Sequence, residues 1–224
     1  MSTPVVAART LSRRFGKRWA LARLNLEVQP GERLLVLGAN GSGKSTLLSV
    51  LSTLLPPTLG ELRLFGLDPV RQARDVRRKV AFLRHAHGMY EDLGGRENLV
   101  VRGRLLDRRI DPLAELKRVG LDDRPEPIRT WSAGMRKRLQ LAMLMMEGPE
   151  LALIDEPFSA LDPSGAREVE GLIRNLPGAV IIVSHQVERA SALCDRALLL
   201  EAGLPRWEGP ATEAASAWAA SQRG

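Results

Sequence analysis

The sequence predicts an α/β fold, and three observations support this prediction. Residues 34–37 form a continuous apolar run, as expected for a strand covered on both faces, and similar runs recur at 151–155 and 179–183. A glycine-rich loop follows the first run and leads into a segment of helical periodicity. The stretch from about 86 to 147 is also helical in pattern, so helices are expected between the strands of one core.

The elements follow one another in a simple order. Residues 4–37 alternate in the β manner, with a turn at residues 30–31. A helix is expected to begin near Lys44 and to run toward residues 56–57. Further strands are expected at 61–65, 79–83, 151–155, 179–183 and 196–200.

The helical stretch forms an insert in this core. Its two amphipathic segments contain Leu99, Val100, Leu105 and Leu106, and then Leu139, Leu141, Ala142, Leu144 and Met145. We therefore expect one domain over residues 1–224, with a core of 1–85 and 148–224 and a helical subdomain over about 86–147.

Composition restricts the class of protein. Of the 224 residues, no apolar run approaches the ~18 residues of a membrane span, and the first residues lack the layout of a signal peptide. Cys194 is the single cysteine, so no intrachain disulfide forms, which fits a reducing cytoplasm. The net charge of +7 fits nucleic acid, anionic lipid, an acidic partner, or a genome of biased composition. Aromatic content of 4% weakens the nucleic-acid interpretation.

The motif Gly-x4-Gly-Lys-Ser spans residues 38–45, after an apolar strand and before a helix. Glycines let backbone N–H groups converge on phosphates, and the helix N-terminus favours an anion. Lys44 would reach the β- and γ-phosphates of a nucleotide, and Ser45 would ligate Mg²⁺. The candidate nucleotide-binding residues of this loop are Gly38, Ala39, Asn40, Gly41, Ser42, Gly43, Lys44, Ser45 and Thr46.

Two later strands end in groups that could act on the nucleotide. Residues 151–155 end at Asp155, which would hold Mg²⁺ through water, and Glu156 would be the general base that polarises the attacking water. His185 follows the apolar strand at 179–183, at the sheet edge where α/β proteins bind ligands. It would contact the γ-phosphate and orient the water.

Together with the segment Trp131-Ser132-Ala133-Gly134-Met135, these motifs resemble the nucleotide-binding subunits of ATP-binding cassette (ABC) transporters over nearly the whole chain. The resemblance implies a P-loop NTPase fold of ABC type, with a RecA-like core, an N-terminal antiparallel β-subdomain and a helical insert. It also implies ATP hydrolysis with Mg²⁺. In this family Ser132 and Gly134 would bind the γ-phosphate of ATP held by the other subunit, so a homodimer closes around two ATP molecules.

The resemblance assigns two further residues. Phe15 matches the aromatic position that stacks on adenine; the alternative is a core phenylalanine. Asp162 lies in the segment 159–162, which matches the part of the family that crosses the dimer interface, and it could also cap the following helix.

The chain departs from the family pattern at two places. The usual signature Leu-Ser-Gly-Gly-Gln is altered at Trp131, Ala133 and Met135. At the position of the family's glutamine loop stands His85, which would touch Mg²⁺ and the attacking water; the alternative is a solvated loop residue. His87 is a second candidate for that place.

These features favour a transport ATPase that drives an integral membrane permease carried on a separate chain, from the cytoplasmic, inner face of the cell membrane. Segment 96–106 would line the groove for a permease helix.

His85 and the following segment 93–99 resemble the ATP-binding subunit of the haem exporter in cytochrome c maturation; a drug or polysaccharide exporter is the alternative. A soluble ABC ATPase acting on nucleic acid is disfavoured because the chain has one cassette and no long coiled-coil insert, so no nucleic-acid partner is expected. A non-ABC phosphate-loop kinase conflicts with Glu156 and the signature.

Overall fold

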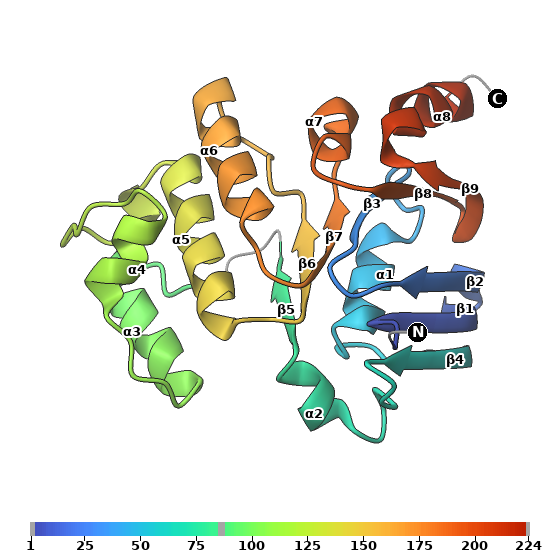
Figure 1. Cartoon of the computed structure of the whole chain (residues 1–224), viewed down its shortest axis with the longest axis horizontal. Coiled ribbons are helices and arrows are strands. Elements are labelled where there is room, and N and C mark those ends of the chain that lie inside the picture. Colours follow the sequence, from blue (N-terminus) through green and yellow to red (C-terminus); the bar gives the residue numbers. More distant parts are fainter. Residues whose placement is uncertain (1–2, 85–87, 223–224) are drawn as a thin grey trace.

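The chain forms two β-sheets with a group of helices beside them (Figure 1). A computed structural model describes residues 3–84 and 88–222. The larger sheet is central, the smaller sheet lies on one side of it, and the helices that follow strand β5 lie on the other. The predicted α/β class is therefore confirmed.

Parallel strands make up most of the larger sheet, whose order is β5-β6-β7-β3-β8-β9. Every neighbouring pair is parallel except β8 and β9, which are antiparallel. The strands are β3 (Arg33–Leu37), β5 (Val80–Leu83), β6 (Leu151–Asp155), β7 (Ala179–Val183), β8 (Arg196–Glu201) and β9 (Leu204–Pro210). Because the carboxyl ends of β3, β6 and β7 meet at one edge, the segments that follow them are brought together there.

The smaller sheet is antiparallel, with the order β2-β1-β4. Its strands are β1 (Val6–Phe15), β2 (Arg18–Val28) and β4 (Leu59–Leu64). The backbone N–H of Ala22 donates to the carbonyl oxygen of Gly203 over 2.8 Å, which ties this sheet to the turn before β9.

The larger sheet separates two apolar cores, because alternate side chains of each strand point to opposite faces. Leu35, Ile154 and Ile182 belong to the core shared with the helices. Leu34 and Ile181 belong to the core shared with the smaller sheet and helix α1. The continuous apolar runs of the sequence reflect this burial on both faces.

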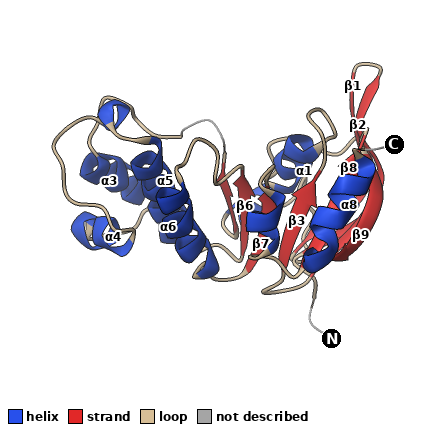
Figure 2. Cartoon of the chain, turned by 90° about the horizontal axis from the view of Figure 1, so that it is seen from above, coloured by secondary structure: helices blue, strands red, loops and turns tan. Residues whose placement is uncertain are grey.

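The helices that follow β5 lie together at one end of the molecule (Figure 2). Those between β5 and β6 are α3 (Gly95–Leu105), α4 (Pro112–Arg118) and α5 (Ala133–Glu147), with a short 3₁₀ turn at Ile128–Thr130. The other helices are α1 (Lys44–Leu51), α2 (Ala73–Arg77), α6 (Pro163–Arg174), α7 (Val187–Ser191) and α8 (Ala214–Ser221), with a 3₁₀ turn at Ala211–Glu213. None of the helices described in residues 3–84 and 88–222 is long and apolar enough to cross a membrane.

Some details differ from the sequence-based expectation. Helix α1 ends at Leu51, short of residues 56–57, and Thr53 beyond it has a left-handed φ of 63° that a helix does not allow. Leu105, expected on the apolar stripe of its helix, is 68% exposed; it is the last residue of α3, which buries Leu99 and Gly103 instead. Strand β9 was not expected, since its exposed residues lack an apolar alternation.

Candidate nucleotide-binding site

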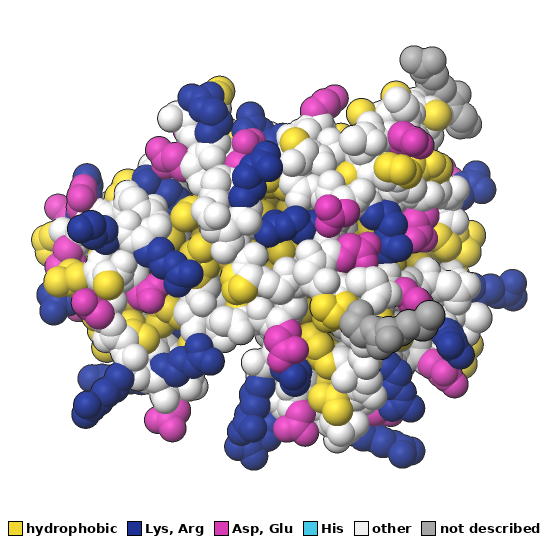
Figure 3. Space-filling view, viewed as in Figure 1, with side chains coloured by type: hydrophobic (Ala, Val, Ile, Leu, Met, Phe, Trp, Pro, Cys, Tyr) yellow, Lys and Arg dark blue, Asp and Glu magenta, His cyan; other side chains and the backbone are white. Residues whose placement is uncertain are grey.

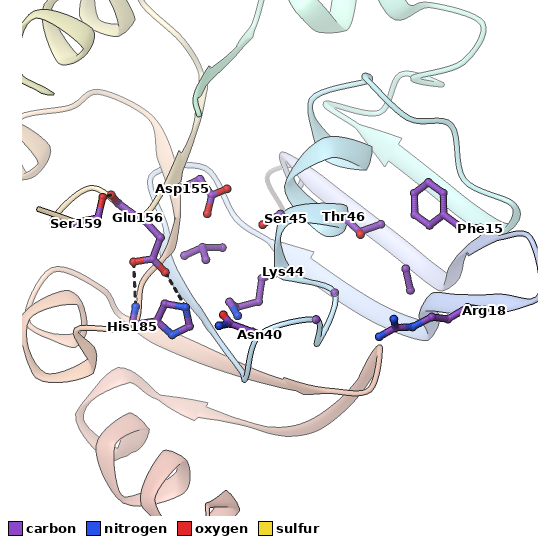
Figure 4. A pocket seen from close by; sticks show the side chains of 14 residues that line it. Phe15, Arg18, Asn40, Lys44, Ser45, Thr46, Asp155, Glu156, Ser159 and His185 are labelled. Atoms are coloured by element: carbon purple, nitrogen blue, oxygen red, sulfur yellow. Dashed lines mark hydrogen bonds and ion pairs between the residues drawn. The ribbon is translucent and has the colours of Figure 1, made fainter. Parts of the chain in front are cut away.

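A cleft of about 720 Å³ opens at the carboxyl edge of the central strands (Figure 4). Segments far apart in the sequence form it: the β1–β2 hairpin, the loop before α1, and the ends of β6 and β7. The lining residues are Phe15, Arg18, Ala20, Asn40, Gly41, Gly43, Lys44, Ser45, Thr46, Asp155, Glu156, Ser159, Val183 and His185. Most of the candidate residues that the sequence indicated therefore face one space.

The glycine-rich loop has a conformation that side chains would prevent. Gly38 has φ 147° and Gly43 has φ 108°, both in the region that L-residues rarely adopt. A Cβ atom on Gly38 would meet the carbonyl oxygen of Leu200 at 2.3 Å, and one on Gly43 would meet that of Ala20 at 2.3 Å. Close contact with two strands thus requires glycine at both positions, and the loop is held against the sheet.

Lys44 is the buried cation of the cleft. Its Nζ donates to the carbonyl oxygens of Gly38 at 2.6 Å and Ala39 at 2.9 Å, so the loop folds around its own ammonium group. Burial lowers the pKa of Lys44, while the nearby carboxylates of Glu156 and Asp155 oppose that change. The ammonium group therefore lies within the loop that leads into α1, and the N-terminus of a helix favours an anion.

Glu156 stands opposite this loop, directly after β6. Its backbone has φ 50°, and its N–H donates to the carbonyl oxygen of Val183 over 2.9 Å. Its carboxylate accepts from the backbone N–H of His185 at 3.2 Å, and Nε2 of that histidine lies 3.4 Å from Oε1 (Figure 4). Burial raises the pKa of Glu156 above its usual value, which is the environment expected of a carboxylate that accepts a proton.

Ser45 and Asp155 supply the oxygen atoms that could hold a magnesium ion. The Ser45 hydroxyl is exposed and the Asp155 carboxylate is half-buried, and both face the cleft. The part of the chain that the structure describes has no group of three or more acidic, histidine or cysteine side chains arranged around a metal. Mg²⁺ usually takes one or two carboxylates and completes its shell with water and phosphate oxygens, so a hydroxyl and a carboxylate facing the cleft would fit it.

Phe15 lies at the rim of the cleft and is 47% exposed, so it is not a core residue. The guanidinium of Arg13 lies 4.8 Å from its ring centroid. An exposed aromatic ring beside an anion-binding loop is suitably placed to stack on a base.

Ser132, Gly134 and Asp162 do not line the cleft. Ser132 is exposed and caps α5 by accepting from the backbone N–H of Met135 at 3.2 Å. Asp162 caps α6 by accepting from Gly165 at 3.1 Å. A Cβ atom on Gly134 would lie 3.8 Å from Leu161, so the start of α5 lies beside the segment that leads into α6.

Two more residues line the cleft: Arg18, which the sequence did not indicate, and Ser159, which the sequence indicated only as part of the segment 159–162. Arg18 lines the cleft, and its guanidinium would lie 3.5 Å from a Cβ atom on Gly41. Ser159 also lines the cleft, and its hydroxyl donates to the carbonyl oxygen of Glu156 at 3.1 Å. Arg18 reaches the cleft only because β1 pairs with β2, so no sequence pattern indicated it.

His85 and His87 lie outside the described residues.

The fold and the cleft define a nucleotide-binding α/β ATPase. The ABC transporter family model matches residues 21–159, and the chain belongs to this family. DrrA3, a daunorubicin resistance ATP-binding protein of Streptomyces coeruleorubidus, is 39% identical over 95% of this chain and 70% of that protein. The lipoprotein-releasing system ATP-binding protein LolD 2 of Rhodospirillum rubrum is 34% identical over 94% and 100%. The bacitracin transport ATP-binding protein BcrA of Bacillus licheniformis is 30% identical over 91% and 68%.

Solved structures share the fold. The dimeric ATP-binding cassette MJ0796, described as a post-hydrolysis state bound to ADP and Pi, superposes with a TM-score of 0.80 at 24% identity, over 92% of this chain and 98% of that one. CbiO1 of Clostridium perfringens, part of the transporter complex cbiONQ, superposes with a TM-score of 0.82 at 20% identity, over 98% and 94%. The chain is thus an ATP-binding ABC ATPase, and the cassette fold predicted from its motifs is confirmed.

Proposed function

We propose that two copies of this chain close around two ATP molecules and drive a separate membrane permease. One observation carries the proposal. Lys44, Glu156 and His185 converge on one cleft, whereas the signature residues Ser132 and Gly134 lie outside it. One chain therefore presents one face to its own nucleotide and another exposed face to the nucleotide of a second copy.

The cleft residues have distinct tasks in hydrolysis. The loop N–H groups and Lys44 bind the phosphates, and Phe15 stacks on adenine. Glu156 accepts a proton from the attacking water, and His185 orients that water against the γ-phosphate. Bound Mg²⁺, held by Ser45 and by Asp155 through water, would neutralise charge on the phosphates.

A second cavity supports docking of a permease helix. It has a volume of about 310 Å³ and lies between α3 and α5, where Met89, Tyr90, Leu105 and Met143 supply apolar surface. The buried side chain of Asn98 donates to the carbonyl oxygens of Tyr90, Leu93 and Gly94, and this shapes the cavity wall. An exposed apolar groove of this kind suits an amphipathic helix.

The permease would hold the chain on the inner face of the cell membrane. The charge pattern fits a protein partner better than nucleic acid. On the face shown in Figure 3, lysine and arginine side chains are interspersed with acidic ones and form no continuous basic stripe.

For the cargo, we propose a drug-type exporter. DrrA3 and BcrA, both similar over most of this chain, carry names of daunorubicin resistance and bacitracin transport. The haem-export hypothesis has no support among the relatives described above.

Reconstitution tests this proposal. The chain would be purified with a candidate membrane permease from the same organism and placed in vesicles, and ATP-dependent uptake of daunorubicin, bacitracin and haem would be compared. Uptake of a drug that Glu156→Gln abolishes supports the proposal. Uptake of haem alone would instead establish the haem exporter, and vesicles in which no substrate moves, with an ATPase rate that no permease changes, would contradict the transport role.

A further inference from the structure

Lys137 is a buried charge next to the hydrolytic end of β6. It lies one turn into α5 and is 5% exposed. Among the residues that the structure describes, only Lys44 is a comparably buried charged side chain. Burial lowers the pKa of Lys137, and the carboxylates of Asp155 and Glu156 oppose this change. A buried ammonium group is costly unless its surroundings compensate it, so its position calls for a partner.

That partner is the backbone of Glu156. Nζ of Lys137 donates to the carbonyl oxygen of Glu156 over 3.5 Å. The same oxygen accepts from the Ser159 hydroxyl at 3.1 Å and from the Ser159 N–H at 3.4 Å. Since Glu156 has an unfavourable φ of 50°, this peptide needs outside support to stay in place. The donors on its carbonyl thereby fix the direction in which its carboxylate enters the cleft.

Helix α5 joins this support to the signature. Ser132 caps the helix, and Lys137 follows five residues later, about 7 Å along the axis. We propose that Lys137 is a positioning residue that links the two nucleotide contacts of one chain. When the partner copy's ATP binds at Ser132 and moves the start of α5, Lys137 moves with the helix and sets Glu156 for hydrolysis of the chain's own ATP. This inference rests on the proposed closing of two copies around ATP.

Substitutions at Lys137 separate its positioning role from a structural one. Lys137→Met keeps the length and removes the donor and the charge, whereas Lys137→Gln keeps a donor without the charge. For Lys137→Met we expect kcat to fall about tenfold while KM for ATP stays within about twofold of the wild-type value, because only the geometry of Glu156 changes. For Lys137→Gln we expect most of the wild-type kcat to be retained. Lys117→Met, an exposed lysine on α4, is the matched control.

The predicted link to the signature requires a double-mutant cycle. Ser132→Ala and Lys137→Met are combined, and kcat is measured for both single variants and the pair. Because the two residues act through one helix, the second substitution is expected to lower kcat much less when the first is already present than it does alone. Additive losses would overturn the link.

Other outcomes would overturn the positioning role itself. These are a wild-type kcat for Lys137→Met, or nucleotide affinity and melting temperature that fall together in both variants. Failure of the dimer proposal is recognised separately: Ser132→Ala would then leave kcat unchanged, whatever Lys137→Met does.

Discussion

The cleft and the start of α5 are built in opposite ways. In the cleft, Lys44 is buried and donates to loop carbonyls, and the half-buried carboxylate of Glu156 accepts from the backbone N–H of His185. At the start of α5, Ser132 is exposed, and its hydroxyl accepts from the N–H of Met135 in its own helix. The first region is prepared within one chain, and the second presents a hydroxyl and helix N–H groups outward. This difference is what the proposal of a nucleotide held jointly by two chains rests on.

Substitution at Glu156 should have the largest effect on the cleft. Glu156→Gln removes the proton acceptor and keeps the shape, so kcat should fall by about 10²–10⁴ while ATP remains bound. The measurement is steady-state ATPase activity with ATP affinity determined in parallel, and Glu188→Gln on exposed α7 is the control. Unchanged turnover would remove Glu156 from the role of base.

Lys44→Ala removes the cation of the loop and two hydrogen bonds that shape it. Charge-assisted contacts to phosphate are lost, so ATP affinity should fall on the order of 10²-fold. Equilibrium binding of a fluorescent ATP analogue measures this, with Lys117→Ala as the control. Wild-type affinity would contradict the assignment of the loop.

At the rim of the cleft, Phe15→Ala should weaken ATP binding by about 1–3 kcal/mol, the usual value of stacking on a base. Stability should change little, because the ring is 47% exposed. Trp19→Ala, an exposed aromatic residue of the same hairpin, is the control for lost surface area. Equal losses in both variants would show that Phe15 has no specific contact with adenine.

Ser132→Ala tests the other side of the comparison. It should lower kcat about tenfold and weaken ATP-dependent dimerisation, with ATP affinity of the monomer within about twofold. The substitution also removes a helix cap, which costs about 0.5–2 kcal/mol of stability. Asp111→Ala removes the cap of α4 and gives the matched control. If both variants lose the same activity, the loss comes from the cap and not from the signature.

A smaller effect follows from the raised pKa of Glu156. Below its unfolded pKa of about 4.3 the carboxyl is neutral in both states, and Glu156→Gln should then match the wild type in stability. As pH rises through the folded pKa, the wild type loses stability relative to the variant, and above it the difference is constant. Melting temperatures of both proteins without nucleotide, between about pH 4 and 8, measure this. A variant that becomes less stable than the wild type as pH rises would contradict the direction of the shift.

Most of the cleft could be predicted from the sequence because short local motifs form it. Apolar runs marked β3, β6 and β7, and parallel strands bring the residues after them to one edge. The loop at 38–45, Glu156 and His185 followed from that placement, and the structure brings them together. The functional roles of these residues and the division into core and helical subdomain stay predictions.

The remaining features depend on tertiary contacts that no local pattern encodes. Arg18 reaches the phosphate loop only through the hairpin of β1 and β2. Lys137 resembles any lysine of a basic helix until the fold buries it against Glu156. Strand β9 pairs at an edge with exposed residues, so its backbone partner β8, and not its apolar content, defines it.

Complementation between two impaired chains tests the shared site most directly. One chain carries Glu156→Gln and the other carries Ser132→Ala, and each alone should hydrolyse ATP slowly. In a symmetric dimer, mixing them leaves one site with both changes and one site with neither, so roughly a quarter of wild-type activity should return. Activity equal to the sum of the separate variants would show that Glu156 and Ser132 serve the same nucleotide from one chain, and it would contradict the account.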